Sequence, residues 1–499
     1  MRLDFLGLLT ARGFKLAVGL ATIFVYARMF GVSATYDAWV WSLGIVNAAT
    51  MILFGPITET IRASYTAIDH KEGRPIAEEY IATVALMMIG ATAVLAAAAV
   101  FLFPIIVRVL YSEQPEQASL SAFFLYALMP SLLISQAVAV LTAHLNCRGS
   151  FFPPEIAGIV GGAVGVLFIV LFPALPALWV LPISYYIGLV SPLLVGASFW
   201  PELTRAVLRL KAVAFRRHAR EALVFSLPLL LPYALSQVSG LIERQFALQA
   251  GTGVLAILSY ALFARNTVQA VFSSALSALA VPSLTRSWSS LDRAPFWHEI
   301  RHWAHQCLVL LTMGMIALFG LSSLAPVILF GGDLGTETQL LLTELLRCYS
   351  IALVSVILYL VGGSALLGAR RGKTYAFLGT LAGAASTLLV IALFPRIGVL
   401  AIPIALGLSH AGAGWLMLST FGRAEAWWII KRVVVCVVVI GVAGSIVQYI
   451  DLVSRDAAVP IIGRLAICLG VSALLCGLWW LLARRQGEPR VSAPLEPGM

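Results

Sequence analysis

Residues 80–103 read YIATVALMMIGATAVLAAAAVFLF, a run of 24 residues without a charged side chain. About 20 helical residues cross the hydrocarbon core of a bilayer, so this run is long enough to span a membrane. Similar runs recur along the whole chain, which has 499 residues, of which 60% are hydrophobic and only 11% charged. Soluble proteins carry about 25% charged residues. The composition therefore excludes a soluble globular fold and predicts an all-α integral membrane protein.

The apolar segments predict about fourteen membrane-spanning helices and leave no room for a separate soluble domain. The first helix is predicted to be retained rather than cleaved as a signal peptide, because Arg12 and Lys15 lie at its start and Arg28 lies within it. An even number of helices places both termini on one side of the membrane. The predicted helices are 10–31, 36–66, 79–103, 119–145, 155–173, 178–199, 221–250, 253–283, 302–330, 338–368, 374–394, 399–421, 429–449 and 459–483.

Lysine and arginine are distributed unevenly between the two predicted sides. The side of the termini holds 25 of the 33 basic residues, and the opposite side holds 4. Loops on the cytoplasmic side of membrane proteins are enriched in Lys and Arg, so both termini are predicted to be cytoplasmic. This topology accounts for the net charge of +10, and no nucleic-acid partner is expected.

The sequence also contains a weak internal repeat. Arg148-Gly149 recurs as Arg371-Gly372 at an offset of 223 residues, and the turn glycines Gly31 and Gly251 are 220 residues apart. An offset of six helices preserves orientation, which predicts two six-helix lobes related by an axis along the membrane normal. Chance similarity between apolar helices is the alternative interpretation.

The repeat defines the predicted organisation of the chain. In the linker that joins the two lobes, basic residues from Arg205 to Arg220 alternate with apolar ones, which predicts an amphipathic helix on the cytoplasmic surface. The predicted parts are an N-lobe at 1–200, a cytoplasmic basic amphipathic linker at 201–221, a C-lobe at 222–422, two further helices at 423–484 and a cytoplasmic tail at 485–499.

Motifs of soluble enzymes are absent from the sequence. It has no P-loop, no HExxH and no metal-spaced group of His and Cys. We therefore expect a protein that is not an enzyme, that does not hydrolyse ATP by itself, and that needs no metal or cofactor.

Charged and polar residues inside the predicted helices are the candidate substrate-binding residues, because ionisable groups at depth are costly. Arg28, near the end of helix 1, either reaches the outer interface or binds an anion, since a guanidinium can hold a phosphate bidentately. Arg265, in the middle of helix 8, is expected to line a cavity. Arg244, Asn47 and Gln237 are further candidates for the same substrate.

Two acidic residues are candidates for gating or ion coupling. Asp37 opens helix 2, where its charge either complements the positive end of its own helix or serves as a gate. Glu243, in helix 7, is predicted to pair with Arg265 when no substrate is bound. Glu344 and Arg347, spaced i, i+3, are predicted to form a local ion pair.

Several motifs resemble those of one transporter family. They are Ala27-Arg28-Met29-Phe30-Gly31, Asp37-Ala38, Asn47, Ser236-Gln237-Val238, Glu243-Arg244, Ser259-Tyr260-Ala261 and Pro282-Ser283-Leu284. They are similar to the MurJ (MviN) lipid II flippase family, within the superfamily of multidrug and polysaccharide exporters, and the resemblance covers nearly the whole chain. It implies two lobes in a V around a cationic cavity that receives a polyprenyl-pyrophosphate-linked sugar, with Arg28 matching a cavity arginine of the family.

The chain departs from the family pattern at four positions. Thr22, Thr50 and Phe263 stand where the family has arginines, and Gly55 stands where it has an acidic residue. Helix 11 also lacks a carboxylate that would complete the sodium site reported for some members. These departures imply a divergent member.

The function expected from the resemblance is that of an alternating-access flippase in the bacterial inner membrane. Its partners would be membrane lipids and an undecaprenyl-pyrophosphate-linked glycan, and a monomer is expected. Lipid II and an exopolysaccharide or O-antigen repeat unit both remain open as substrates. A cation-coupled multidrug exporter of the same superfamily is the alternative, followed by a membrane glycosyltransferase and a non-transporting scaffold.

Overall fold

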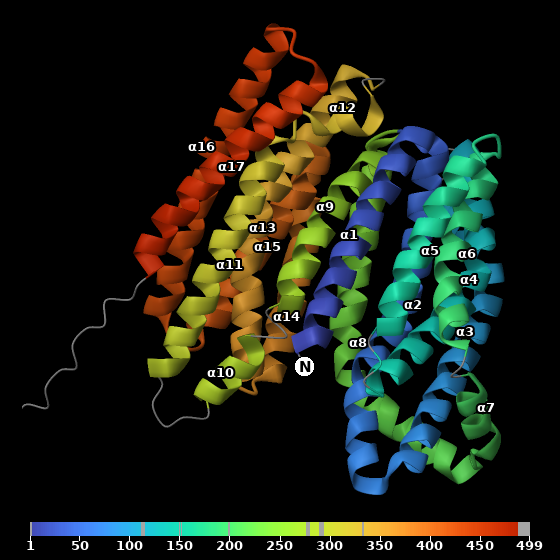
Figure 1. Ribbon diagram of the computed structural model, residues 1–499. Coiled ribbons are helices and arrows are strands. Elements are labelled where there is room, and N and C mark those ends of the chain that lie inside the picture. Colours follow the sequence, from blue (N-terminus) through green and yellow to red (C-terminus); the bar gives the residue numbers. More distant parts are fainter. Residues whose placement is uncertain are drawn as a thin grey trace, which may run out of the picture. The chain divides into compact units, whose positions relative to one another are not determined.

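The structure is a computed structural model that describes residues 2–110, 115–148, 150, 152–197, 200–275, 280–288, 294–331 and 334–487. Within these residues every regular element is a helix (Figure 1). Gly149 of the repeat motif and residues 488–499 of the predicted tail lie outside them. The first half of the chain forms α1 (Arg2–Phe30), α2 (Ala34–Glu72), α3 (Arg74–Leu110), α4 (Pro115–Cys147), α5 (Phe152–Leu171), α6 (Ala177–Val195), α7 (Trp200–Arg209) and α8 (Ala212–Gln249). The second half forms α9 (Val254–Ala275), α10 (Val281–Trp288), α11 (Ala294–Gly320), α12 (Ala325–Phe330), α13 (Thr336–Gly368), α14 (Gly372–Ile397), α15 (Ala401–Ser419), α16 (Arg423–Asp456) and α17 (Ile461–Gly487).

Length and hydropathy confirm an integral membrane fold. In the described residues, ten helical stretches can cross a membrane, or eleven if the bent pair within α8 forms one span. One stretch, Gly372–Ser419, has 48 residues and contains α14 and α15 with a 3-10 turn between them. At 1.5 Å per residue it would measure about 72 Å, more than twice the hydrocarbon thickness. Shorter apolar helices occur at Ala17–Phe30 and Val254–Thr267, and the number fourteen stays a prediction.

For the segment predicted at 253–283, the structure describes α9 up to Ala275 and α10 from Val281, and residues 276–279 lie outside the described part of the chain. Another predicted helix was wrong as a single element. The segment predicted at 302–330 is interrupted after Gly320, where Ser322 hydrogen-bonds through its Oγ to the carbonyl of Phe319 and the chain turns. Ala325 then begins α12, with Pro326 in the first helical turn, a position that proline favours. Hydropathy does not report this break, because the residues on both sides are apolar.

The chain divides into two compact units, Met1–Ser259 and Tyr260–Met499. The first unit therefore includes α8, which the sequence repeat assigned to the C-lobe. Gly31 and Gly251 both have positive φ, +58° and +138°, which glycine adopts readily, but the two values differ. The repeat and its lobe boundaries stay a prediction.

In the first unit, α2 and α8 pack side by side along most of their length. The indole of Trp41 donates to Gln245 Oε1 at 3.1 Å, and the hydroxyls of Thr60 and Ser226 are 2.8 Å apart. Residue numbers rise on α2 as their partners' numbers fall on α8, so the two helices are antiparallel. Further pairs along the same interface are Gly44 with Arg244, Gly55 with Tyr233 and Glu72 with Arg217.

We predict that Gly55→Ala weakens this interface. A Cβ atom at Gly55 would lie 2.5 Å from the ring of Tyr233, which is closer than atoms can approach. Overpacking of this kind costs about 1–3 kcal/mol, and thermal unfolding of the purified protein in detergent should show a lower midpoint. Gly90→Ala is the matched control, because nothing lies within 4 Å of its Cβ and alanine favours the helix. Equal midpoints for both variants would contradict the close α2–α8 contact.

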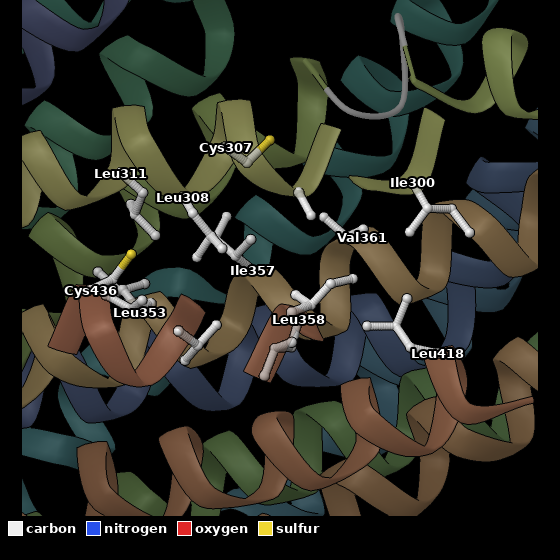
Figure 2. Packing of buried hydrophobic residues seen from close by; sticks show 14 of the residues in the cluster. Ile300, Cys307, Leu308, Leu311, Leu353, Ile357, Leu358, Val361, Leu418 and Cys436 are labelled. Carbon is white, nitrogen blue, oxygen red and sulfur yellow. The ribbon is translucent and has the colours of Figure 1, made fainter. Parts of the chain in front are cut away.

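The second unit has a continuous apolar core formed by α11, α13, α15 and α16. Figure 2 shows Ile300, Cys307, Leu308 and Leu311 of α11 facing Leu353, Ile357, Leu358 and Val361 of α13, with Leu418 and Cys436 from α15 and α16. These side chains repeat every three or four residues, so each helix buries one stripe. The core holds α13 in the middle of the unit.

Polar contacts attach the last two helices to this core. The predicted Glu344–Arg347 ion pair is confirmed, with Nη1 and Oε1 2.5 Å apart, and Arg347 also donates to Gln448 of α16 at 2.8 Å. Asp451 of α16 pairs with Arg464 of α17 at 2.7 Å. Paired charges are tolerated in apolar surroundings, whereas isolated ones are not.

Candidate functional site

Arg28 lies in the last turn of α1, beside an aromatic corner formed with α2. Phe30 stacks on Tyr36, and Tyr26 meets both rings edge-on, which fixes the turn at Gly31. Arg28 is exposed on another face of α1, and its guanidinium lies over the ring of Phe24 at 5.3 Å from the centroid. Phe24 precedes Arg28 by one turn. The guanidinium therefore lies beside the body of the helix, and both interpretations, an arginine that reaches the outer interface and one that binds an anion, stay predictions.

Asp37 reaches a helix that is distant in sequence. Its carboxylate, fully buried, accepts hydrogen bonds from the backbone amides of Gly253 and of Ala256, the latter at 2.7 Å. Gly253 precedes α9, so Asp37 caps the free N–H groups at the start of that helix and places a negative charge at its positive end. Asp37 also lies in the first turn of α2, so its charge can complement both helices, and its role as a gate stays a prediction.

The contact depends on glycine at position 253. Gly253 has φ of +86°, and a Cβ there would lie 2.0 Å from Cγ1 of Val32 in the α1–α2 turn. Only a residue without a side chain allows the two turns to approach so closely. The α1–α2 and α8–α9 turns are thus packed together at the end of the first unit that carries Asp37.

The remaining candidates in the first unit lie along α2 and α8. The side chain of Arg244 lies against Gly44. A Cβ atom added at Gly44 would be 2.7 Å from Cδ of Arg244. Glu243 is 8% exposed and Gln237 is half-buried on α8, whereas Asn47 is exposed on α2. The structure therefore places Arg244 at the α2–α8 interface. Sequence reasoning missed Trp41, Gly44 and Gln245, for which no motif exists.

Arg265 belongs to the second unit, on α9. Its Nε is buried and has no hydrogen-bond partner among the described residues. The guanidinium lies close enough to His410 in α15 for an electrostatic interaction with that ring. Nδ1 of His410 donates to the carbonyl of Leu406 at 3.0 Å, and its ring meets Tyr359 edge-on. A buried donor without a partner costs about 1–3 kcal/mol, so Arg265 favours an anion or water as its neighbour. Glu243 lies in the first unit, so the predicted Glu243–Arg265 pair stays a prediction.

Three of the positions that depart from the family pattern make contacts within or between helices. The hydroxyls of Thr22 and Thr50 donate to carbonyls of their own helices, those of Val18 and Val46, at 2.8 and 2.9 Å. At Gly55 the ring of Tyr233 fills the space that a longer side chain would need. In this chain these positions therefore carry helix contacts rather than charge.

Together, the apolar helices define a polytopic membrane protein that carries charged residues within its helices. Arg28, Arg244 and Arg265 place guanidinium groups on these helices, a side-chain type that in general can bind phosphate, and Asp37 joins two turns. Residues 26–461 match the protein family described as "Lipid II flippase MurJ". The chain belongs to this MurJ lipid II flippase family.

Solved structures show the same fold at low sequence identity. "Lipid II flippase MurJ, inward closed conformation" matches with a TM-score of 0.74 and 16% identity, covering 96% of this chain and 98% of that one. An inward-facing multidrug resistance MATE family transporter of the MOP superfamily matches with a TM-score of 0.64 and 12% identity, over 83% and 96% of the two chains. A mutant of the Vibrio cholerae MATE transporter VcmN gives 0.56 and 13%, over 84% and 98%.

Proposed function

We propose that the protein is a flippase that moves lipid II across the bacterial inner membrane by alternating access. The family match over residues 26–461 carries this proposal. No covalent bond is made or broken. The polyprenyl tail stays in the hydrocarbon, so only the pyrophosphate and the sugar need a polar route, and a charged group crossing lipid unaided would face a cost of several kcal/mol.

The pyrophosphate is proposed to be bound by Arg28 and Arg265, with Arg244 as a further contact. Two features support this role: the exposed guanidinium of Arg28 beside Phe24, and the buried Nε of Arg265 that lacks a partner in the described part of the chain. Asn47 and Gln237 are proposed to hydrogen-bond the polar headgroup. Arginine suits this task because its planar fork matches two phosphate oxygens at once.

Asp37 is proposed to be the gating residue. Its two hydrogen bonds to the start of α9 hold the α1–α2 and α8–α9 turns together. We propose that this contact breaks in one of the two states of the transporter, since a carboxylate can be solvated by water when the turns separate. Glu243, which is buried on α8, is proposed as a second residue for gating or ion coupling.

Reconstituted vesicles provide the test of substrate. Labelled lipid II would be placed in both leaflets, and an enzyme that modifies lipid II would be added outside. We expect the protein to make the inner pool accessible, and protein-free vesicles to protect about half of the label throughout. Movement of an exopolysaccharide precursor or export of a cationic drug, without movement of lipid II, would replace the proposal with one of the two superfamily alternatives.

Both termini are proposed to be cytoplasmic, supported by the 25-to-4 distribution of basic residues. A reporter fused after Met499 that is active only in the cytoplasm is expected to be active. The same reporter inserted after Ala174, between α5 and α6, should be inactive. A periplasmic reading at Met499 would overturn the predicted topology.

A further inference from the structure

The turn between α7 and α8 presents basic and apolar side chains on one exposed surface. From Leu203 to Arg220 the chain has six Lys or Arg and no acidic residue. Leu208 and Val213 are 81% and 82% exposed, more than any other large apolar side chain in the described part of the chain. We call this surface the basic corner, and define it as the exposed residues Arg205, Leu208, Arg209, Lys211, Val213 and Arg216.

The segment before the corner is fixed to the first unit. Arg148, at the end of α4, forms an ion pair with Glu202 of α7 and donates to Glu78 of α3 at 2.8 Å. Leu203 is buried in the apolar cluster formed by α2 and α3. The guanidinium of Arg148 also holds the pKa of Glu202 below its ordinary value. The carboxylate is therefore charged at neutral pH, and the ion pair is lost only when the pH falls through that lowered pKa.

The segment after the corner is fixed as well. Arg217 pairs with Glu72 at the end of α2, and the buried ring of His218 meets Tyr80 edge-on. Both flanks are thus anchored, while the side chains of the corner point away from the unit. Leu208 shares its helix face with Arg205, and Val213 shares its face with Arg216, because each pair is spaced i, i+3.

The length of α6 indicates where the corner lies. Ala177–Val195 has 19 residues, about 28 Å of helix, which matches the hydrocarbon core of a bilayer. Trp200, the first residue of α7, follows five residues later, and tryptophan is enriched at the membrane interface. The α7 helix therefore starts in the headgroup layer, where exposed apolar side chains can enter lipid.

We propose that the basic corner binds the anionic headgroups of the adjacent leaflet, with Leu208 and Val213 inserted at the boundary of the acyl chains. Four cationic side chains complement the lipid phosphates, and the two apolar side chains require an environment that a soluble anion does not offer. The bound lipid is a fixed contact of the linker rather than the transported substrate, so this inference is separate from lipid II transport. Its effect is to hold the connection between α6 and α8 against the membrane.

Amide hydrogen exchange of the full chain in nanodiscs tests the proposal. Exchange across residues 204–214 is expected to be slower in phosphatidylcholine with added phosphatidylglycerol than in phosphatidylcholine alone. The slowing should reach at least about fivefold, the contribution of one basic side chain near an anionic surface. The slowing should disappear at about 1 M salt, where the screening length falls to about 3 Å.

The combined variant R205Q/R209Q/K211Q/R216Q should exchange equally fast in both lipids, and L208S/V213S should lose part of the slowing.

A matched variant separates a local site from a general effect of charge. Lys71, Arg370, Lys373 and Arg423 are exposed basic residues on the same predicted side, and K71Q/R370Q/K373Q/R423Q should keep the full slowing. Arg148 and Arg217 are unchanged in every variant, so both anchors remain. Equal exchange of the wild-type protein in both lipids would overturn the proposal. So would loss of the slowing in the matched variant, or the same slowing caused by inorganic phosphate in neutral nanodiscs.

Discussion

Replacing Asp37 with alanine is expected to reduce lipid II transport by at least about tenfold. The change leaves two buried amides, those of Gly253 and Ala256, without an acceptor. Each unsatisfied buried donor costs about 1–3 kcal/mol, and about 1.4 kcal/mol changes an equilibrium tenfold. The state in which the two turns are joined is therefore depleted, and a transporter that needs both states slows down. Transport would be measured in vesicles, with the amount of folded protein determined by size-exclusion chromatography.

Two further variants show whether this loss comes from the contact itself. Asp37→Asn keeps one acceptor oxygen but loses the charge, so its transport should lie between that of the wild type and that of Asp37→Ala. Glu116→Gln removes an exposed carboxylate from the first turn of α4 and should leave transport unchanged. Wild-type transport by Asp37→Ala at normal protein levels would show that the contact is not a gate.

Removal of both proposed phosphate ligands has the second large expected effect. Arg28→Ala and Arg265→Ala should each lower lipid II transport by about 10- to 100-fold, because a hydrogen bond to a charged group contributes about 1.5–3 kcal/mol. The double variant should fall to the level of protein-free vesicles. Arg28→Lys should restore only part of the activity, since an ammonium cannot bind a phosphate bidentately.

Arg108→Ala is the matched control for Arg28→Ala. Both arginines are exposed and lie in the last turn of their helices, α3 and α1. Arg108→Ala should transport normally, so a loss confined to Arg28→Ala would not come from a missing charge at a helix end. Full transport by the double variant, at wild-type protein levels, would exclude these two arginines as substrate ligands.

The sequence proposed candidate site residues but did not predict most of their contacts. Arg28, Asp37 and Arg265 stood out because charge is rare in apolar helices. Their surroundings did not follow from spacing. Asp37 reaches a helix more than 200 residues later, and Arg244 lies over Gly44 of another helix. Glu344 and Arg347 were paired correctly because i, i+3 neighbours on one helix are close whatever the fold.

The sequence by itself determined the class of the protein. In lipid every backbone hydrogen bond must be made within the segment, so a long apolar run such as residues 80–103 becomes a helix without help from distant residues. The tertiary structure alone decided which helices meet and which polar groups they share. The α2–α8 interface, the cap that Asp37 provides to α9 and the anchoring of α7 by Arg148 all join residues far apart in the chain. Such contacts depend on side-chain volume and on close approach at glycines such as Gly44 and Gly253, and hydropathy carries no information about either.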